Sequence, residues 1–429
     1  MRGKNFIGIK TTTKRYYRLI LTRMLYKIMS QTVEHTLNTR RFSCLLLIWI
    51  FINLLSCNQN ATNSPKDFQY EVPIQTNDGW ETASLYSVGM DEGPLLKLLE
   101  KLDKLTDHRI HSILIVKDGK LVFEQYYPGD KFNLAQPTGE TGFDMNDTHN
   151  LCSATKSITS ALIGIAIDQS FIQSVNQKVS DFFPTYSDLF ELESEKYNLT
   201  LQHLLTMTSG IEWDDESTSY FDSRNDLYRL FTSSDPIRYI FSKDLSVTPG
   251  TVFDYANCNT NLLGEIIRKS SQLRLDQFSD NYLFSKLGIT QFEWQMLPND
   301  VVFCSGDLRL RPRDMAKFGY LFLNNGMWHG ERIISQEWIN TSTQKLIDPN
   351  DYSNNYSWAD GYGFQWWIWE NIRGLQFQAY FAAGWGGQYI IIAPEFDMVI
   401  VSTAGNYYTE IKMPIESIVV DYIIPSISN

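Results

Sequence analysis

Ser153-Ala154-Thr155-Lys156 places a hydroxyl group and an amine three residues apart. If this segment is helical, both side chains share one face, and Ser153 Oγ can meet Lys156 Nζ at the start of the helix. A lysine whose pKa is lowered by burial can take the serine proton, while free N–H groups at a helix start can stabilise an oxyanion. Alone, the pattern more often marks a serine that caps a helix beside a solvated lysine.

Tyr255-Ala256-Asn257 follows a Pro-Gly turn and precedes a stretch that predicts a helix. In extended backbone, residues two apart point the same way, so Tyr255 and Asn257 can share one site. A tyrosine close to an ammonium group can relay a proton, and Asn257 can hydrogen-bond both the lysine and a substrate carbonyl or amide. The alternative is a buried tyrosine followed by an asparagine in a turn.

Trp385-Gly386-Gly387-Gln388 lies between two predicted strands. Glycines in this position let a substrate approach an edge strand and expose backbone N–H groups to it. The alternative is an ordinary glycine-rich hairpin or bulge.

Other catalytic patterns are missing from the sequence. There is no GxSxG, HExxH, GxGxxG or GxxxxGK[ST] motif, and His149 precedes Ser153 without any motif of its own. We therefore expect neither a metal site nor an organic cofactor. Cys152, Cys258 and Cys304 remain after the N-terminal leader, without a CxxC pair, so we expect no disulfide framework, and we interpret Cys152 as a small buried thiol.

The elements that must position these residues follow from hydrophobic periodicity. Two apolar runs flank Asp118-Gly119 and predict a hairpin over 111–127. Predicted helices and strands alternate in blocks along the rest of the chain. The helices are 153–168, 201–207, 259–270, 313–324 and about 410–423, and the strands are 361–370, 376–383, 388–393 and 397–403. The expected α/β (α+β) fold is a mostly antiparallel sheet built from both chain ends, with helices on both faces and an inserted all-α region over about 150–300.

Taken together, the three motifs resemble those of the serine β-lactamase and penicillin-binding-protein superfamily. Its SxxK, YxN and K[ST]G-type motifs occur in this chain order, as Ser153-Ala154-Thr155-Lys156, Tyr255-Ala256-Asn257 and Trp385-Gly386-Gly387 do here. LTLQHLLTMTSGIEW, PGTVFDYANCNTNLLGEII and LRPRDMAKFGYLFLNNG also look like characteristic segments of this superfamily. The likeness runs from about residue 80 to the C-terminus and implies a β-lactamase/DD-peptidase-like fold.

The resemblance also implies roles for individual residues. The tyrosine in its second motif makes this chain similar to the class C branch of the superfamily. This similarity implies that Ser153 attacks the substrate carbonyl and that Lys156 and Tyr255 move the serine proton to the leaving group. The backbone N–H groups of Ser153 and Gln388 would form the oxyanion hole. Trp385 stands where most relatives have a lysine that binds the substrate carboxylate, so antibiotic hydrolysis should be weak.

The WGG pattern resembles family VIII esterases and 6-aminohexanoate-oligomer hydrolases. It implies a serine hydrolase that acts on a small carboxylic ester or amide. Two alternatives stay open at this point: a D-amino-acid peptidase or β-lactamase, and a non-catalytic sensor that keeps the fold.

The N-terminus predicts export. Arg40-Arg41 precede the apolar run 44–55, which suits a signal peptide, and Leu54-Leu55-Ser56-Cys57 resembles a bacterial lipobox with Cys57 as the lipidation site. We expect a leader over 1–56, a tether over 57–80 and a hydrolase domain over 81–429, carried on the bacterial cell envelope by a lipid anchor in the membrane. Residues 57–429 hold 27 basic and 48 acidic residues, a net charge of −21, which argues against nucleic acid as a partner.

Overall fold

The computed structural model describes residues 68–133, 136–190, 195–352 and 356–427. The predicted leader and the predicted lipidation site Cys57 lie outside these residues and stay predictions. Within the described ranges, no helix combines the length and the apolar character needed to cross a membrane.

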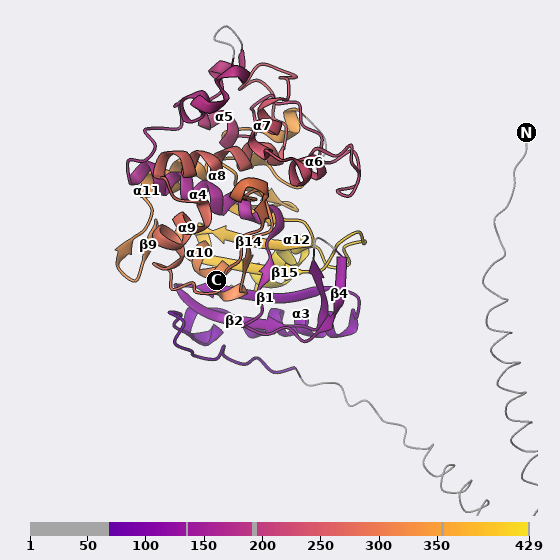
Figure 1. Ribbon diagram of the computed structural model, residues 1–429. Coiled ribbons are helices and arrows are strands. Elements are labelled where there is room, and N and C mark those ends of the chain that lie inside the picture. The colour runs from indigo at the N-terminus through magenta and orange to yellow at the C-terminus, as the bar shows by residue number, and fades with distance from the viewer. Residues whose placement is uncertain (1–67, 134–135, 191–194, 353–355, 428–429) are drawn as a thin grey trace, which may run out of the picture. The chain divides into compact units, whose positions relative to one another are not determined.

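The main sheet is antiparallel and has seven strands within the described residues (Figure 1). Its strand order is β11-β12-β13-β14-β15-β1-β2, so the N-terminal hairpin pairs with the last strand of the chain. The strands are β1 (Ile110–Lys117), β2 (Lys120–Tyr126), β11 (Gly361–Tyr362), β12 (Trp367–Ile372), β13 (Leu375–Gly384), β14 (Gln388–Ala393) and β15 (Met398–Ala404). The expectation of one sheet built from both chain ends is confirmed.

The turn between β1 and β2 shows why a short sequence signal located this hairpin. Asp118 and Gly119 both have positive φ, at 52° and 73°. A two-residue turn with positive φ at both positions matches the right-handed twist of the strands that it joins, and Asp-Gly is a preferred sequence for it.

The predicted strand 361–370 is interrupted in the structure. Gln365 has a φ of 61°, and the Gly363 N–H donates a hydrogen bond to the Trp366 carbonyl, so the chain turns between β11 and β12. The aromatic residues of this segment suggested one continuous strand, because periodicity does not report a local left-handed residue. The prediction of a single strand here was wrong.

Each face of the sheet is covered by its own hydrophobic core, because successive strand residues point to opposite faces. On β1, Ile113 and Ile115 enter one core, whereas Leu114 and Val116 enter the other. Helix α3 (Glu92–Lys104) and the C-terminal helical segment cover the first face, and α4 and α10 cover the second. Helices on both faces were expected and are confirmed.

The inserted region lies between β5 (His149–Asn150) and β6 (Met296–Leu297), and its described part consists of helices joined by loops, with two isolated β-bridges. Figure 1 shows α5, α6 and α7 grouped beyond α8, away from β1 and β2. Its α-helices are α4 (Thr155–Asp168), α5 (Leu201–Leu205), α6 (Asp226–Thr232), α7 (Pro236–Phe241), α8 (Asn257–Ser271) and α9 (Leu275–Ser279). The remaining larger elements are β3 (Gly129–Asn133), β4 (Gln136–Thr141), β7 (Val301–Val302), β8 (Arg309–Leu310), α10 (Pro312–Leu323), β9 (Met327–Trp328), β10 (Glu331–Arg332), α11 (Gln336–Ser342) and α12 (Ile415–Ile418).

The C-terminal helix starts later than the pattern indicated. Pro414 is the N-cap residue of α12, and its extended backbone places the helix start at Ile415 rather than near 410. After α12 the chain continues in helical turns to Ser426.

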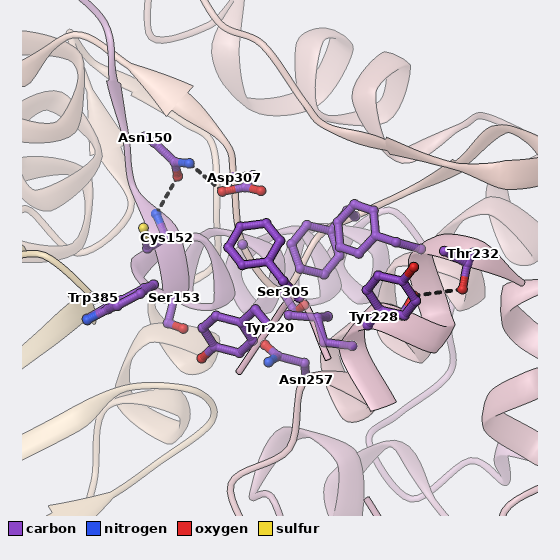
Figure 2. A pocket seen from close by; sticks show the side chains of 15 residues that line it. Asn150, Cys152, Ser153, Tyr220, Tyr228, Thr232, Asn257, Ser305, Asp307 and Trp385 are labelled. Atoms are coloured by element: carbon purple, nitrogen blue, oxygen red, sulfur yellow. Dashed lines mark hydrogen bonds between the residues drawn. The ribbon is translucent and has the colours of Figure 1, made fainter. Parts of the chain in front are cut away.

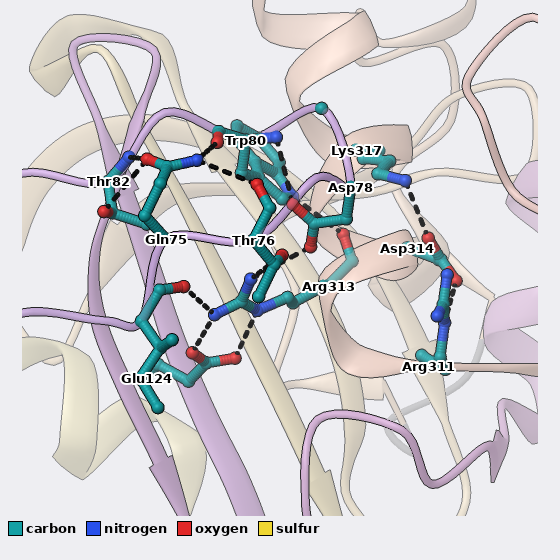
Figure 3. A network of polar contacts seen from close by, with 12 residues as sticks. Gln75, Thr76, Asp78, Trp80, Thr82, Glu124, Arg311, Arg313, Asp314 and Lys317 are labelled. Atoms are coloured by element: carbon teal, nitrogen blue, oxygen red, sulfur yellow. Dashed lines mark hydrogen bonds and ion pairs between the residues drawn. The ribbon is translucent and has the colours of Figure 1, made fainter.

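The described part of the predicted tether, residues 68–80, packs onto the domain (Figure 3). Trp80 is buried, and its Nε1–H donates to the Arg313 carbonyl over 3.1 Å. The Arg313 guanidinium pairs with Glu124 at 2.5 Å and with Asp78 at 3.0 Å, which ties this segment to α10 and β2. These contacts join residues 68–80 to the compact unit that spans Phe68–Asn429, which polar composition alone does not reveal.

Candidate active site

Ser153 lies in a single 3₁₀ turn, Cys152–Ala154, that runs directly into α4. Cys152 has a φ of 46°, and its N–H donates to Asn150 Oδ1 over 2.7 Å, which holds the strained residue in place. The N-cap residues of the turn and of α4 are Leu151 and Ala154, and neither cap involves a side-chain hydrogen bond. The alternative in which Ser153 merely caps the helix does not hold.

Lys156 is 1% exposed, and its amine has three oxygen neighbours. Nζ lies 3.0 Å from Ser153 Oγ, 2.7 Å from Asn257 Oδ1 and 2.7 Å from the Ser305 carbonyl oxygen. The last two atoms accept hydrogen bonds and cannot donate them. A neutral amine can therefore give its two protons to them and direct its lone pair at Ser153.

The surroundings of Lys156 favour this neutral form. Burial removes the ammonium group from water and lowers the pKa of Lys156 to about 8, while the nearby charge of Asp215 works in the opposite direction. A lysine with this pKa is partly deprotonated near neutral pH and can act as a general base.

Tyr255 completes the contacts around the hydroxyl group. The Ser153 hydroxyl group is near enough to oppose the rise in the pKa of Tyr255, and Lys156 Nζ lies 4.9 Å from the centre of the tyrosine ring. The ring stacks on Trp367 with 5.5 Å between the centroids, which fixes its orientation. Burial raises the pKa of Tyr255 far above its usual range, so the phenol keeps its proton and can pass one on without existing as a phenolate.

Asp215 is a site residue that the sequence reasoning missed. Its Oδ2 accepts hydrogen bonds from Asn257 Nδ2 over 2.6 Å and from Trp213 Nε1 over 2.7 Å. This contact fixes the amide of Asn257 with its oxygen toward Lys156, because the nitrogen is occupied by the carboxylate. Burial raises the pKa of Asp215, and its hydrogen bonds oppose this effect. The only local hint was an acid two residues after Trp213, which is too common to be informative.

The third motif forms the hairpin between β13 and β14. These are interior strands, so the expectation of an edge strand was wrong. Gly386 and Gly387 have φ values of 88° and 98°, and a Cβ on Gly384 would lie 2.0 Å from the Leu151 carbonyl oxygen. The hairpin is therefore packed against the segment that precedes Ser153, and glycine is required there for steric reasons.

Gln388, the first residue of β14, is buried, and its side-chain Nε2 donates to the Ala404 carbonyl over 2.6 Å. This hydrogen bond anchors the end of the hairpin against β15. The role of the Gln388 backbone N–H in an oxyanion hole stays a prediction.

Trp385 stands at the rim of the site and is 36% exposed. Its indole makes edge contacts with the rings of Tyr220, Tyr407 and Tyr408, at centroid distances of 5.6, 5.1 and 4.7 Å. The position that would carry a cation in lysine-containing relatives is therefore part of an aromatic cluster. A second group of aromatic residues is buried in the core and does not line the cavity: Phe364, Trp366, Trp367 and Trp369.

A cavity of about 260 Å³ opens beside Ser153 (Figure 2). It brings together Ser153 from the turn before α4, Asn257 from the start of α8 and Trp385 from the β13–β14 hairpin. Most of the wall is aromatic or apolar. The further lining residues are Asn150, Cys152, Tyr220, Phe221, Leu227, Tyr228, Phe231, Thr232, Phe303, Ser305, Gly306 and Asp307.

Competing chemistries find little support among the described residues. No group of three or more His, Cys, Asp or Glu side chains in them is arranged to hold a metal ion. Burial raises the pKa of the Cys152 thiol to about 12, so it is not an activated nucleophile. His149 packs against His111 and Phe143, with ring centroids 5.5 and 4.7 Å apart.

Comparison with known proteins places this geometry in a family. The family model described as beta-lactamase matches residues 100–406, which is more than half of the chain. The chain belongs to the beta-lactamase family. Within this family it is a serine hydrolase, and the resemblance seen in the three motifs is confirmed.

Individual relatives include hydrolases with different named substrates. A 6-aminohexanoate-dimer hydrolase of Paenarthrobacter ureafaciens is 26% identical over 321 residues, covering 71% of this chain and 74% of that protein. A putative beta-lactamase from Bacteroides dorei has a TM-score of 0.61 at 18% identity and covers 79% of this chain and all of that one. A family VIII carboxylesterase has a TM-score of 0.59 at 16% identity, covering 78% and 96%. The last two show the shared fold.

Proposed function

We propose that this family member forms an acyl-enzyme on Ser153 and hydrolyses carboxylic esters or small amides. The observation that carries the proposal is the set of contacts around Lys156. Two carbonyl oxygens take the protons of a buried amine, and its third neighbour is Ser153 Oγ at 3.0 Å.

The proposed reaction has two halves. Ser153 Oγ attacks the substrate carbonyl carbon while Lys156 Nζ takes the hydroxyl proton. Tyr255 then passes a proton to the leaving oxygen or nitrogen as its bond to the carbonyl carbon breaks, and the Lys156 ammonium group gives Tyr255 the serine proton in exchange. Water attacks the acyl-enzyme, gives its proton to the same relay and releases the carboxylic acid with Ser153 restored. The backbone N–H groups of Ser153 and Gln388 are the proposed donors to the oxyanion.

The substrate class rests on the cavity and on Trp385. An exposed indole stacks on apolar or amide groups but cannot form an ion pair with a carboxylate. The names of two relatives, a carboxylesterase and a 6-aminohexanoate-dimer hydrolase, agree with an ester or a linear amide as substrate. A β-lactam or D-amino-acid peptide is the second candidate. It is disfavoured because position 385 holds a tryptophan and not a lysine that could bind the substrate carboxylate.

The test is hydrolysis of a panel of p-nitrophenyl esters by the wild type and by Ser153→Ala. We expect the variant to lose about a thousandfold or more in kcat, because a nucleophile acts as a unit with its base. Fluorophosphonate labelling of the wild type, absent in the variant, checks the same residue directly. Undiminished hydrolysis by Ser153→Ala would remove this serine as the nucleophile, and nitrocefin turnover as fast as ester turnover would favour the second candidate.

Export and anchoring form a separate proposal, supported by the apolar run 44–55 and by Leu54-Leu55-Ser56-Cys57. We propose that Cys57 is lipidated and holds the enzyme on the cell envelope. Metabolic labelling with a clickable fatty acid should mark the wild type and spare Cys57→Ala. Equal labelling of both proteins would refute the assignment.

A further inference from the structure

The cavity beside Ser153 has one charged residue among its fifteen lining residues, and that residue is Asp307. Its other walls are formed mainly by aromatic and aliphatic side chains, with a few neutral polar groups near the serine. A ligand that fills this space therefore meets an apolar surface and one carboxylate. Carboxylates at the edge of an apolar cavity fix the orientation of a ligand through its charge.

Asp307 forms no direct ion pair with a basic side chain within the described residues. One carboxylate oxygen accepts a hydrogen bond from Asn150 Nδ2 at the upper end of the site (Figure 2). The nearest basic residue along the chain, Arg309, instead contacts Glu293 at 3.9 Å and the Phe132 carbonyl. Burial raises the pKa of Asp307, and the hydrogen bond from Asn150 and the more distant charges of Arg309 and Lys156 only partly oppose this effect, as expected of a carboxylate that lacks a direct ion pair.

Further acidic groups add to the negative potential around the site. The negative charges of Asp215 and Glu216 both favour the ammonium form of Lys156. Burial, and after it the charge of neighbouring carboxylates, raises the pKa values of Glu216 and Asp254. A positively charged ligand would relieve this repulsion, whereas an anionic ligand would increase it. The aromatic rings of Tyr220 and Tyr228 in the cavity wall also favour a cation over an anion.

We propose that this site selects esters or amides that carry a positively charged amine joined to the reacting carbonyl through an apolar segment, and that Asp307 binds the amine. The proposal rests on the proposed acyl-enzyme chemistry of Ser153 and adds the class of substrate. It assigns Asp307 as the residue that determines specificity.

Asp307 has a second possible role that an experiment must separate from this one. Asp307 accepts a hydrogen bond from the Asn150 side chain. That side chain in turn accepts a hydrogen bond from the N–H of Cys152, the residue directly before Ser153. Asp307→Asn preserves the accepting oxygen for Asn150 and removes the charge alone. A positioning role would therefore survive this substitution, while recognition of a cation would not.

The experiment compares three p-nitrophenyl esters of equal acyl length that end in a trimethylammonium, a tert-butyl or a carboxylate group. A second set carries the same groups on the alcohol side, with product release followed by pH-stat. In at least one set, the wild type should prefer the cationic ester over its tert-butyl isostere by roughly ten- to a hundredfold in kcat/KM, the range of one charge–charge attraction at about 5 Å and an effective dielectric constant of about 25 to 50. Asp307→Asn should lose most of this preference, measured as the ratio of kcat/KM for the cationic and the neutral ester within the same protein.

Two outcomes would overturn the proposal. One is a wild type without preference for the cationic ester in either set, and the other is a preference that persists in Asp307→Asn. An equal loss on all three esters would assign Asp307 to positioning of the turn and also refute recognition of the amine. Failure of the acyl-enzyme proposal would be seen separately, as undiminished hydrolysis of the neutral ester by Ser153→Ala.

Discussion

Asp215→Asn tests whether the buried carboxylate controls the base that we assign to Lys156. Asp215 Oδ2 accepts the hydrogen bonds from both Trp213 and Asn257. An asparagine can keep both bonds with its amide oxygen, so the substitution removes the charge and leaves the geometry of Asn257 intact. Loss of a negative charge disfavours the ammonium form of Lys156 and lowers its pKa.

The size of this effect follows from the contacts that connect the two groups. Asp215 Oδ2 is 2.6 Å from Asn257 Nδ2, and Asn257 Oδ1 is 2.7 Å from Lys156 Nζ. Adding the width of the amide puts the carboxylate oxygen and the amine about 7 Å apart. At an effective dielectric constant of about 20, Coulomb's law gives about 2.4 kcal/mol, or roughly 1.7 pH units. Water in the open cavity reduces this, so we expect a shift of roughly 1 to 1.7 units.

The assay is the pH dependence of kcat/KM for a neutral p-nitrophenyl ester, which reports the free enzyme. In the wild type, the rate should rise with pH through about 8, because Lys156 must lose its proton to act as the base. In Asp215→Asn the same limb should lie at lower pH, so the share of neutral lysine at pH 7 rises from about a tenth to between about a half and about four-fifths. Glu212→Gln, an exposed residue of the same segment, is the matched control and should leave the limb in place.

An acid limb at the same pH in the wild type and in Asp215→Asn would refute the reasoning. It would mean either that Asp215 carries no charge in the active enzyme or that the titrating group is not Lys156. A limb that moves to higher pH would contradict the sign of the coupling. Circular dichroism of both proteins guards against a loss of folding.

Two further substitutions test how the site is supported. Gly384→Ala should lower Tm and ester hydrolysis together, because the new Cβ would lie 2.0 Å from the Leu151 carbonyl oxygen. Gly142→Ala is the control, since a Cβ on Gly142 has no neighbour within 4 Å. Equal melting curves for the two variants would contradict the prediction. Arg313→Ala should reduce the free energy of unfolding by about 3–5 kcal/mol in a urea titration, because it leaves buried carboxylates unpaired. Arg373→Ala, at an exposed ion pair, should cost less than about 1 kcal/mol, and similar losses for both would show that burial of the network is unimportant.

Local patterns were sufficient for most of the elements around the site. Asp118-Gly119 predicted the hairpin, since its turn depends on two residues alone. The apolar run after Ser153 predicted α4 from its period, and the strands that became β13, β14 and β15 were located within one or two residues. The split between β11 and β12 escaped prediction, because one left-handed glutamine, Gln365, leaves no trace in hydrophobicity.

Taken alone, the sequence predicted the central pair, Ser153 and Lys156, because the second and third motifs follow in the expected order and support a spacing that by itself more often marks a helix cap. It also placed Tyr255, Asn257 and Trp385 in order along the chain. Only the tertiary structure decided what surrounds that pair. The Ser305 carbonyl that orients Lys156 lies 149 residues away in the chain, and the Asp215 carboxylate that orients Asn257 lies 42 residues away.

The physical reason is the range of the interactions involved. Helix period, turn geometry and motif spacing are set by neighbouring residues, whereas burial, pKa and cavity charge depend on side chains that the fold brings together from distant segments. Asp307 illustrates the difference. In the sequence it is one of 49 acidic residues, and in the structure it is the single charged residue in the wall of the cavity beside Ser153.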